Sequence, residues 1–323
     1  MFTSREIHLL DWPPSRLPMP GRIAMVEVEV PEPQPGQAVV RNLYMAIDPG
    51  LLLRMQQVDP DAQPEFVLGG PPWGHAIGEV VESAAPELQP GEVVLHRMAW
   101  REYAVADATQ LRVVNPGLYP KLSNHLSSAV VAYVGLHQVP INPGDTVVVS
   151  SAAGAVGSIA GQLVRVFGAG RVIGSVGSSD KATWLTGELG FDCAFDYHDG
   201  WPDLGGVDVF YDNVGGPQLE AGIRAMNPHG RILLCGGLAE QLDGKPHGVA
   251  NLQLAIERRL HLQGFTADDH VELFPKFNEE FPKLVAEGRV VLHETFINGL
   301  DNLVDAMQAQ IQGTYRGKLL LQF

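Results

Sequence analysis

The segment from Thr146 to Val176, TVVVSSAAGAVGSIAGQLVRVFGAGRVIGSV, constrains the fold of this chain more than any other. An apolar β-branched run leads through a turn of small residues into a helix-like segment, and a second apolar run follows. Apolar β-branched runs favour buried strands, and short strands that alternate with helices favour parallel pairing. The segment therefore predicts a strand, a helix and a second parallel strand, which together form a βαβ unit.

The same alternation continues through residues 121–287. Apolar runs such as VDVFYDNVG and GRILLCGG alternate with helix-like segments such as DKATWLTGELG and PQLEAGIRAM. This pattern predicts a doubly wound parallel sheet of the Rossmann type, an α/β fold with helices on both faces. The later segment HVELFPKFNEEFPKLVAEG is expected to be helical, with its two internal prolines kinking or dividing the helix.

The first 120 residues have a different pattern. Short β-runs such as RIAMVEVEV and HAIGEVVESA are separated by Pro- and Gly-containing turns, and several alternate apolar with polar residues as half-buried antiparallel strands do. The tail, residues 288–323, is expected to form a strand, a helix and a strand that pack back against this β domain. The predicted domains are therefore 1–120 completed by 288–323, and 121–287.

Charge and cysteine content exclude several functions. The net charge of −15 opposes binding to nucleic acid or to an anionic membrane surface. No apolar run reaches the roughly 18 residues that span a bilayer, and the charged, proline-containing N-terminus does not resemble a signal peptide. The two cysteines, Cys193 and Cys235, do not suggest a disulfide framework. We expect a cytoplasmic protein.

The turn inside the βαβ unit follows the pattern Ala152-x-Gly154-x-x-Gly157, in which alanine replaces the first glycine of GxGxxG. Small residues let the backbone approach a pyrophosphate at a helix N-terminus, where unpaired N–H groups bind anions. Helix–strand packing alone explains such a turn as well. The second strand at βαβ distance favours the dinucleotide interpretation.

The end of the second strand separates the two nicotinamide cofactors. A free ribose favours an acidic residue there, but the chain has Gly177, Ser178 and Lys181, with Asp180 as helix cap or first-turn acid. Serine can donate a hydrogen bond and lysine can supply charge to a 2′-phosphate. Lys181 could instead be an exposed first-turn residue, although a lysine there opposes the helix dipole. The sequence therefore predicts NADP(H).

With these pieces, the chain resembles the zinc-independent branch of the medium-chain dehydrogenase/reductases. Within it, the chain resembles the NADPH-dependent alkenal/one oxidoreductases, which include prostaglandin reductases, plant double-bond reductases and curcumin reductases. The resemblance rests on the order and spacing of VRNLYMAIDP, AYVGLHQVPINPGDTVVVSSAAGAVGSIAGQL, GSSDK, LGFDCAFDY, YDNVGG, GRILLCGG, LQGF, AEGRV and GKLLLQF. It implies a GroES-like catalytic domain beside the Rossmann domain.

The resemblance also implies cofactor roles by position. The pyrophosphate would be held by Gly154, Ala155, Val156 and Gly157, and the 2′-phosphate side by Ser178, Lys181 and Tyr197. Asn213, near the end of the fourth strand, and Cys235, Gly236 and Gly237, after the fifth, are implied to contact the cofactor, and Phe265 and Thr266 to approach the nicotinamide. For the Cys235 side chain, a small core residue is an equal alternative. Tyr315 could reach the cofactor or substrate, or be an ordinary residue at the start of a strand.

Zinc is not expected. The segment WGHAIGEVVE resembles the GHE-x-x-G element of zinc alcohol dehydrogenases, but Ala76 replaces the glutamate and Asp48 stands near the expected cysteine ligand. His75 with two scattered cysteines does not supply the three protein ligands that a catalytic zinc needs. A zinc alcohol dehydrogenase is therefore excluded by ligand count.

The implied reaction is hydride transfer from NADPH to the β-carbon of an enone or enal. The family often has a tyrosine after the Asp-Pro of its N-terminal loop, where this chain has Gly50, and another after LQGF, where it has TADDH. Tyr44 is a tentative catalytic phenol, although core packing explains it equally well. A quinone reductase or a non-catalytic NADPH-binding redox sensor are the alternatives, and a homodimer is expected only by family analogy.

Overall fold

The structure, a computed structural model, describes residues 2–13, 21–55 and 66–323. Its backbone contacts divide the chain into two units. Unit 1 comprises residues 1–126, 294–315 and 319–323, and unit 2 comprises 127–293 and 316–318. The boundaries lie a few residues beyond the expected positions 120 and 287. The three residues Arg316–Lys318 associate with unit 2, although the tail on both sides of them belongs to unit 1.

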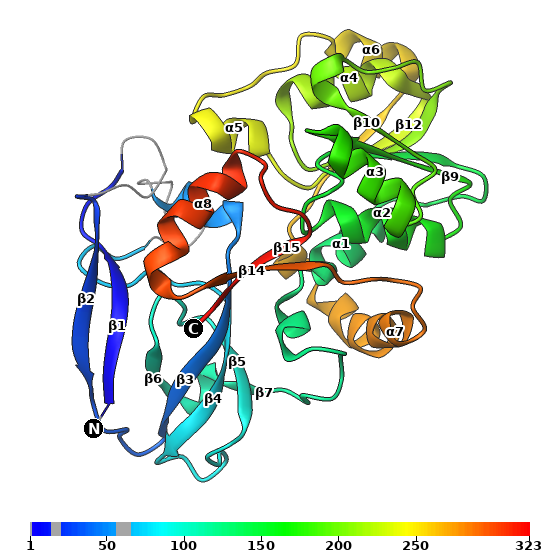
Figure 1. The fold of residues 1–323 in the computed structure, drawn as a ribbon. Coiled ribbons are helices and arrows are strands. Elements are labelled where there is room, and N and C mark those ends of the chain that lie inside the picture. The colour runs from blue at the N-terminus through cyan, green and yellow to red at the C-terminus, as the bar shows by residue number, and fades with distance from the viewer. Residues whose placement is uncertain (1, 14–20, 56–65) are drawn as a thin grey trace. The chain divides into compact units, whose positions relative to one another are not determined.

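Unit 1 is built on a seven-stranded sheet and a separate hairpin (Figure 1). The main sheet has the order β14-β15-β3-β4-β5-β7, and β6 also pairs with β3. Strand β15 pairs antiparallel with β3, Leu320 opposite Ala46, so the C-terminal tail completes this sheet. The strands are β1 Phe2–Leu9, β2 Ile23–Val30, β3 Gln37–Ala46, β4 Ala76–Ser83, β5 Val93–His96, β6 Tyr103–Asp107, β7 Arg112–Val113, β14 Glu294–Asn298 and β15 Lys318–Gln322.

The helices of unit 1 are short, apart from α8. They are η1 Pro49–Met55, η2 Ala108–Gln110, η3 Leu122–Leu126, η6 Leu300–Asn302 and α8 Leu303–Ile311. Helix α8 contributes Leu303, Ala306 and Met307 to a buried core shared with strands β1, β3 and β15. The tail is therefore a strand, a helix and a strand, as its apolar pattern predicts.

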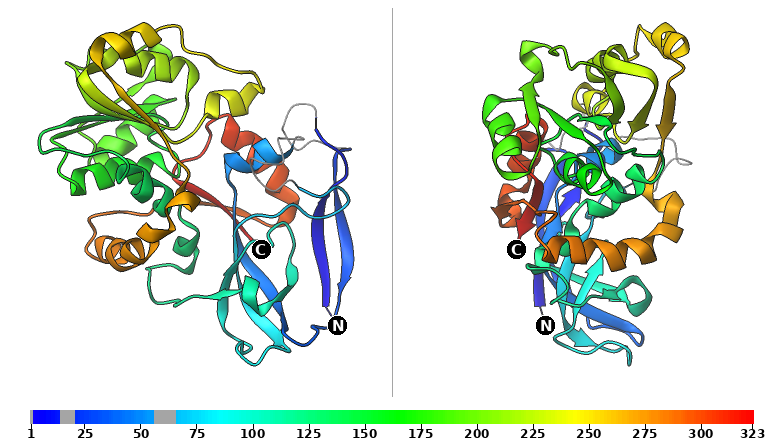
Figure 2. Two further views of the ribbon diagram at one scale, coloured as in Figure 1. Left: turned by 180° about the vertical axis from the view of Figure 1, so that it is seen from behind. Right: turned by 90° about the vertical axis from the view of Figure 1, so that its right-hand side faces the viewer.

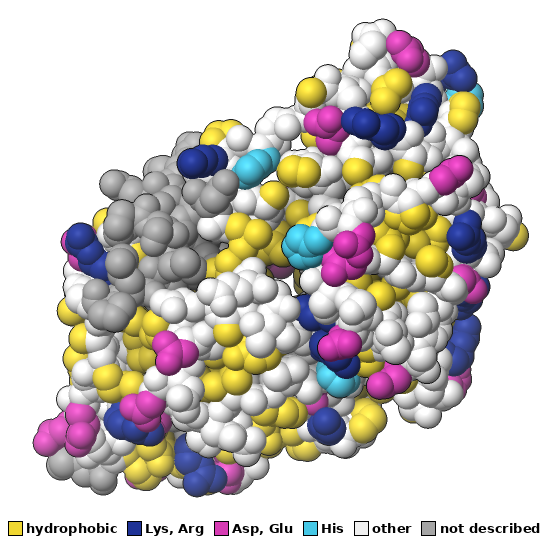
Figure 3. Space-filling model, turned by 45° about the horizontal axis from the view of Figure 1, so that its top comes forward, with side chains coloured by type: hydrophobic (Ala, Val, Ile, Leu, Met, Phe, Trp, Pro, Cys, Tyr) yellow, Lys and Arg dark blue, Asp and Glu magenta, His cyan; other side chains and the backbone are white. Residues whose placement is uncertain are grey.

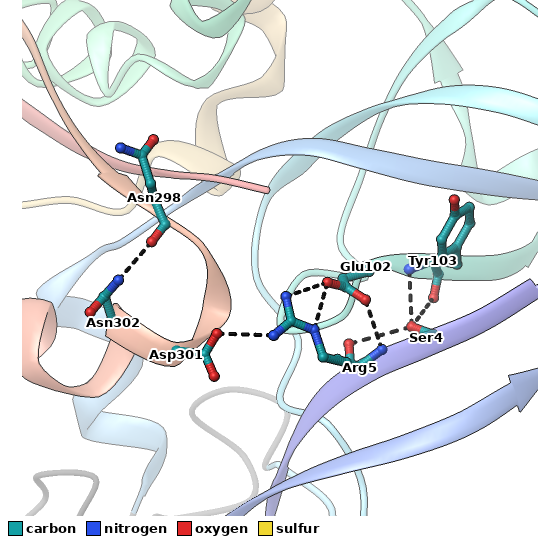
Figure 4. Close-up of polar contacts among 7 residues, drawn as sticks. All are labelled: Ser4, Arg5, Glu102, Tyr103, Asn298, Asp301 and Asn302. Atoms are coloured by element: carbon teal, nitrogen blue, oxygen red, sulfur yellow. Dashed lines mark hydrogen bonds and ion pairs between the residues drawn. The ribbon is translucent and has the colours of Figure 1, made fainter.

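Polar contacts join the β1–β2 hairpin to the rest of unit 1 (Figure 4). Arg5 on β1 lies between two carboxylates, with its Nη2 2.7 Å from Glu102 and its Nη1 2.9 Å from Asp301. The backbone N–H of Tyr103 donates to Ser4 Oγ at 3.1 Å. Ion pairs as exposed as these contribute about 0–1 kcal/mol each, so they orient the hairpin more than they stabilise it.

Unit 2 is a doubly wound α/β domain. Its six strands are all parallel in the order β10-β9-β8-β11-β12-β13, and β8 and β11, the two central strands, are where the order reverses. The strands are β8 Thr146–Val149, β9 Arg171–Val176, β10 Cys193–Asp196, β11 Val207–Asp212, β12 Met226–Leu234 and β13 His261–Gly264. This order is that of the dinucleotide-binding fold, so the predicted fold class is confirmed.

The helices of unit 2 are α1 Ala129–Leu136, α2 Gly157–Val166, α3 Ser179–Glu188, η4 Tyr197–Asp199, α4 Gly216–Ala225, α5 Leu238–Asp243, α6 Leu252–Arg258, η5 Ala267–Leu273 and α7 Phe274–Ala286. Of these, α2, α3, α4 and α6 pack directly on strands of the parallel sheet (Figures 1 and 2). Coverage of both faces explains why Val147, Val148 and Val149 of β8 are all fully buried. An uninterrupted apolar strand is stable only where no face meets water.

The proline-containing segment, which begins at His270, is not divided at either of its prolines. Its non-helical residue is His270 itself, with a φ of −122° and a ψ of 46°, and α7 continues through Pro282. Pro275 lies in the first turn of α7, where its missing N–H would have no helical acceptor. The first proline therefore helps to start the helix, and the second is tolerated within it.

The surface charge and the character of the helices both bear on possible partners. On the face shown in Figure 3, acidic and basic side chains are intermingled. Across the described residues, no helix has both the length and the apolar character to cross a membrane.

Candidate functional site

The turn after β8 brings the backbone very close to the start of α2. A Cβ added to Gly157 would lie 2.4 Å from Ser151 O and 2.9 Å from Ala152 Cα, so only glycine fits without movement. Ser151 itself has a positive φ of 47°, and Gly154 N donates to Ser151 O at 2.9 Å. The turn is therefore tight and leads directly into the N-terminus of α2, and helix N-termini are general anion-binding sites.

Alanine at position 152 is compatible with this turn. Ala152 is fully buried, and its N–H donates to Ser175 O of β9 at 3.0 Å. A Cβ added to Gly174 of β9 would lie only 3.0 Å from Ala152 Cβ, so glycine at position 174 leaves space for the alanine methyl group. The departure from GxGxxG is thus compensated by the neighbouring strand.

Three of the residues expected at the 2′-phosphate lie close together at the turn that follows β9. Ser178 is the N-cap of α3, and its Oγ accepts from Lys181 N at 3.4 Å. Tyr197 lies beside the same turn, because a Cβ on Gly177 would be 3.4 Å from the Tyr197 ring and hydroxyl. Asp180 is in the first turn of α3 and Ser178 is the cap, which resolves the alternative left open for Asp180. Burial and the positive charge of Arg316 lower the pKa of Lys181.

A buried carboxylate links the ends of the two central strands by hydrogen bonds. Asp212 at the end of β11 is fully buried and accepts from Ser150 Oγ at 2.7 Å and from the N–H groups of Val214 and Gly215 at 3.0 and 2.9 Å. Burial raises its pKa, and these hydrogen bonds oppose that effect. Asn213 is held by the same group, since its N–H donates to Ser150 Oγ and its Nδ2 to Ser150 O. The network fixes the point where the strand order reverses.

The Cys235–Gly237 segment follows β12 and lies against the Asn213 backbone. A Cβ on Gly236 would be 2.8 Å from Asn213 O, so this glycine permits close approach of two strand ends. The Tyr211 hydroxyl donates to Cys235 Sγ at 3.4 Å. Burial raises the pKa of the Cys235 thiol to about 11, so the side chain is a neutral, weakly reactive group.

Phe265 follows β13 and packs against helix α1. A Cβ on Gly135 would lie 2.4 Å from Phe265 Cζ and 2.8 Å from the Tyr211 hydroxyl. Gly135 is therefore needed for the two aromatic side chains to reach this position. Thr266 comes next and caps η5 in an extended conformation.

The site residues expected in unit 2 thus follow the ends of all six parallel strands. Each follows the carboxyl end of β8, β9, β10, β11, β12 or β13, and in open α/β sheets these ends share one edge, where ligands bind. The glycine contacts at positions 157 and 236 and the cation at 181 fit a phosphorylated dinucleotide. No pattern in the sequence indicates the close contacts at Gly135 or the burial of Asp212.

Tyr44 and Tyr315 belong to unit 1. Tyr44 on β3 packs against Phe296 of β14, with 5.8 Å between ring centroids. Tyr315 packs against the core cluster that contains Leu319 and Leu321. Both have a packing role, and their roles toward cofactor or substrate stay predictions.

The expected lack of a metal site stays a prediction as well. Among the described residues, no group of three or more His, Cys, Asp or Glu side chains is placed to hold a metal ion. His75 is exposed at the start of β4, and His96, opposite Ala76, is buried with its Nδ1 accepting from Met98 N at 3.1 Å.

Comparison with known proteins agrees with this arrangement. Residues 6–114 match a family described as the N-terminal domain of oxidoreductase, and residues 155–287 match one described as zinc-binding dehydrogenase. The chain is 32% identical to a 2-alkenal reductase (NADP(+)-dependent) of Nicotiana tabacum, covering 91% of this chain and 89% of that protein. It is 32% identical to a (+)-pulegone reductase of Mentha piperita, covering 92% and 90%.

Solved structures show the same similarity in three dimensions. CurA from Vibrio vulnificus in complex with NADPH superimposes with a TM-score of 0.88 at 27% identity, covering 98% of both chains. The chain belongs to the alkenal/one oxidoreductase family of the medium-chain dehydrogenase/reductase superfamily.

Proposed function

We propose that this protein is an NADPH-dependent reductase of the C=C bond of α,β-unsaturated ketones and aldehydes, and that it acts without a metal. The observation that carries the proposal is the likeness, over nine-tenths of both chains, to a 2-alkenal reductase (NADP(+)-dependent). The site supports the use of NADP(H) independently, because Gly177 and Ser178 stand after β9, where NAD-binding sites have an acid, and Lys181 follows in the first turn of α3.

The cofactor would be held along the strand ends of unit 2. Gly154 to Gly157 would bind the pyrophosphate, and Ser178, Lys181 and Tyr197 the 2′-phosphate. Asn213, Cys235, Gly236 and Gly237 would contact the cofactor at the ends of β11 and β12, and Phe265 and Thr266 would approach the nicotinamide. Bound NADPH supplies a hydride from C4 to the β-carbon of the substrate.

The protein's own contribution is positioning and stabilisation of developing charge. An enone spreads the added charge onto its oxygen, so the enzyme needs to orient two partners and donate a hydrogen bond rather than polarise an unactivated carbonyl. The Ser150–Asp212–Asn213 hydrogen bonds hold one wall of the nicotinamide site in place. Tyr44 is the phenol that we propose as hydrogen-bond donor to the substrate oxygen.

The metal-free proposal rests on the side chains available. Ala76 stands where zinc alcohol dehydrogenases have a glutamate, and Asp48 near where they have a cysteine ligand. Activity should therefore survive dialysis against a chelator, and chelator-sensitive alcohol oxidation would refute this part. A homodimer is the assembly we expect by family analogy, and analytical ultracentrifugation tests it. The cytoplasm is the location we expect, because the two cysteines do not suggest a disulfide framework.

The substrate class is tested by following NADPH oxidation with a panel of 2-alkenones, 2-alkenals and quinones. We expect turnover with the first two classes and at least tenfold lower kcat/KM with NADH. Turnover restricted to quinones would replace the proposal with a quinone reductase. Tight NADPH binding without oxidation by any member of the panel would leave a non-catalytic NADPH-binding protein.

A further inference from the structure

The backbone around Arg316 is anchored beside the phosphate turn. Gly317 N donates to Ala153 O at 2.8 Å, and Gly317 forms a parallel bridge with Gly154. A Cβ on Gly317, whose φ is +65°, would lie 2.2 Å from His293 O, and Lys318 N donates to that same oxygen at 2.9 Å. Residue 316 is therefore held next to the turn even though it lies far along the chain.

The Arg316 side chain extends toward helix α3. Its guanidinium carbon lies 5.8 Å from the centroid of the Trp184 ring, within cation–π range. Trp184 is itself fixed, since it is 3% exposed and its Nε1 donates to Glu188 at 3.2 Å. The arginine is thus packed on a rigid part of the helix.

Lys181 lies one turn before Trp184 on the same helix, and residues three apart share a helix face. The two cations are close enough to interact, because the charge of Arg316 adds to burial in lowering the pKa of Lys181. Holding like charges together costs free energy, and an anion bound between them would offset that cost.

The position of this pair defines which anion it fits. Lys181 and Ser178 form the start of α3 directly after β9, with Tyr197 beside Gly177. In a βαβ dinucleotide site, the end of the second strand meets the adenosine ribose, whereas the first turn meets the pyrophosphate. A dianionic phosphate on the ribose 2′-oxygen suits two cations, and an arginine binds phosphate through paired N–H groups.

We propose that Arg316 is a second cation, beside Lys181, for the 2′-phosphate of NADP(H), and that it increases selectivity for NADP(H) over NAD(H). The inference rests on the proposed use of NADP(H), and it adds to that binding site a residue from a distant segment of the chain. The neighbouring Tyr315 belongs to unit 1 and packs in its core cluster.

Calorimetric titration of the full chain with 2′,5′-ADP, NADP⁺ and NAD⁺ tests this role without turnover. Arg316→Gln should weaken binding of 2′,5′-ADP and NADP⁺ by roughly ten- to hundredfold and change NAD⁺ binding less than twofold. Arg316→Lys should recover part of the loss, because lysine keeps the charge but not the forked geometry.

The matched control is Arg289→Gln, which removes one exposed arginine of unit 2 that lies 3.7 Å from Glu287. It should leave all three affinities unchanged, and the melting temperatures of all variants should match that of the wild type. Equal weakening of NAD⁺ and NADP⁺ by Arg316→Gln would place the arginine on the pyrophosphate and overturn the proposal. Unchanged 2′,5′-ADP binding would overturn it too. Failure of the wild type to bind 2′,5′-ADP or NADP⁺ would instead refute the cofactor assignment.

Discussion

Replacement of Gly157 by alanine tests whether the close approach at the turn is what makes the cofactor site. The added Cβ would lie 2.4 Å from Ser151 O, whereas ordinary contacts to a Cβ begin at 3.4 Å, so α2 or the turn must move by about 1 Å. Overpacking of this kind costs roughly 1–3 kcal/mol of unfolding free energy. The same movement displaces the amides at the start of α2, so NADP⁺ affinity should fall at least tenfold, about 1.4 kcal/mol.

Gly187→Ala is the matched control, because a Cβ at that position in α3 has no atom within 4 Å. Alanine in place of a helical glycine should raise the unfolding free energy by about 0.5–1 kcal/mol and leave NADP⁺ binding unchanged. Urea unfolding and calorimetric titration of both variants supply the two numbers. A Gly157→Ala protein with wild-type stability and affinity would refute the reasoning.

Three further predictions concern single side chains. The His96 side chain is only 3% exposed, and burial together with the charges of Arg101 and His75 lowers its pKa to about 4. As the pH falls below 6.5, this histidine therefore takes up a proton in the unfolded chain before it does so in the folded protein. The unfolding free energy should therefore drop by about 2–3 kcal/mol between pH 6.5 and 4.5, and urea titrations should show His96→Asn losing that part of the acid dependence. Because its pKa is raised to about 11, Cys235 should react with iodoacetamide at pH 8 about a hundredfold more slowly than an ordinary thiol. Mass spectrometry of a labelled Cys193→Ser protein measures this rate, and labelling of Cys235 as fast as that of an ordinary thiol would contradict the prediction. Tyr44→Phe should lower kcat for an enone by about ten- to hundredfold with NADPH affinity unchanged, and an unaltered kcat would remove Tyr44 from the mechanism.

Local sequence patterns predict much of the fold. The apolar run through Val147–Val149 predicts a strand buried on both faces, and β8 is such a strand. The small residues before α2 predict a tight turn, and the contact of Gly157 with Ser151 shows why glycine is required there. These features depend on neighbours in sequence, which a pattern can represent.

Contacts between distant segments account for what could not be predicted. Nothing near Arg316 in the sequence indicates that it lies over Trp184, because the contact depends on where Gly317 meets the phosphate turn. The sequence likewise identifies Asn213 as a site residue but not the buried Asp212 that positions it through Ser150. Pro282 was expected to disrupt its helix, yet α7 continues through it.

The most direct test of the central claim is the fate of the transferred hydrogen. The enzyme is incubated with a simple 2-alkenone and NADPH deuterated at C4, and the product is analysed by NMR. Reduction of the C=C bond by hydride transfer should leave deuterium at the β-carbon of a saturated ketone. Deuterium at the carbonyl carbon of an allylic alcohol, or NADPH that binds but is never oxidised by alkenones, would contradict it.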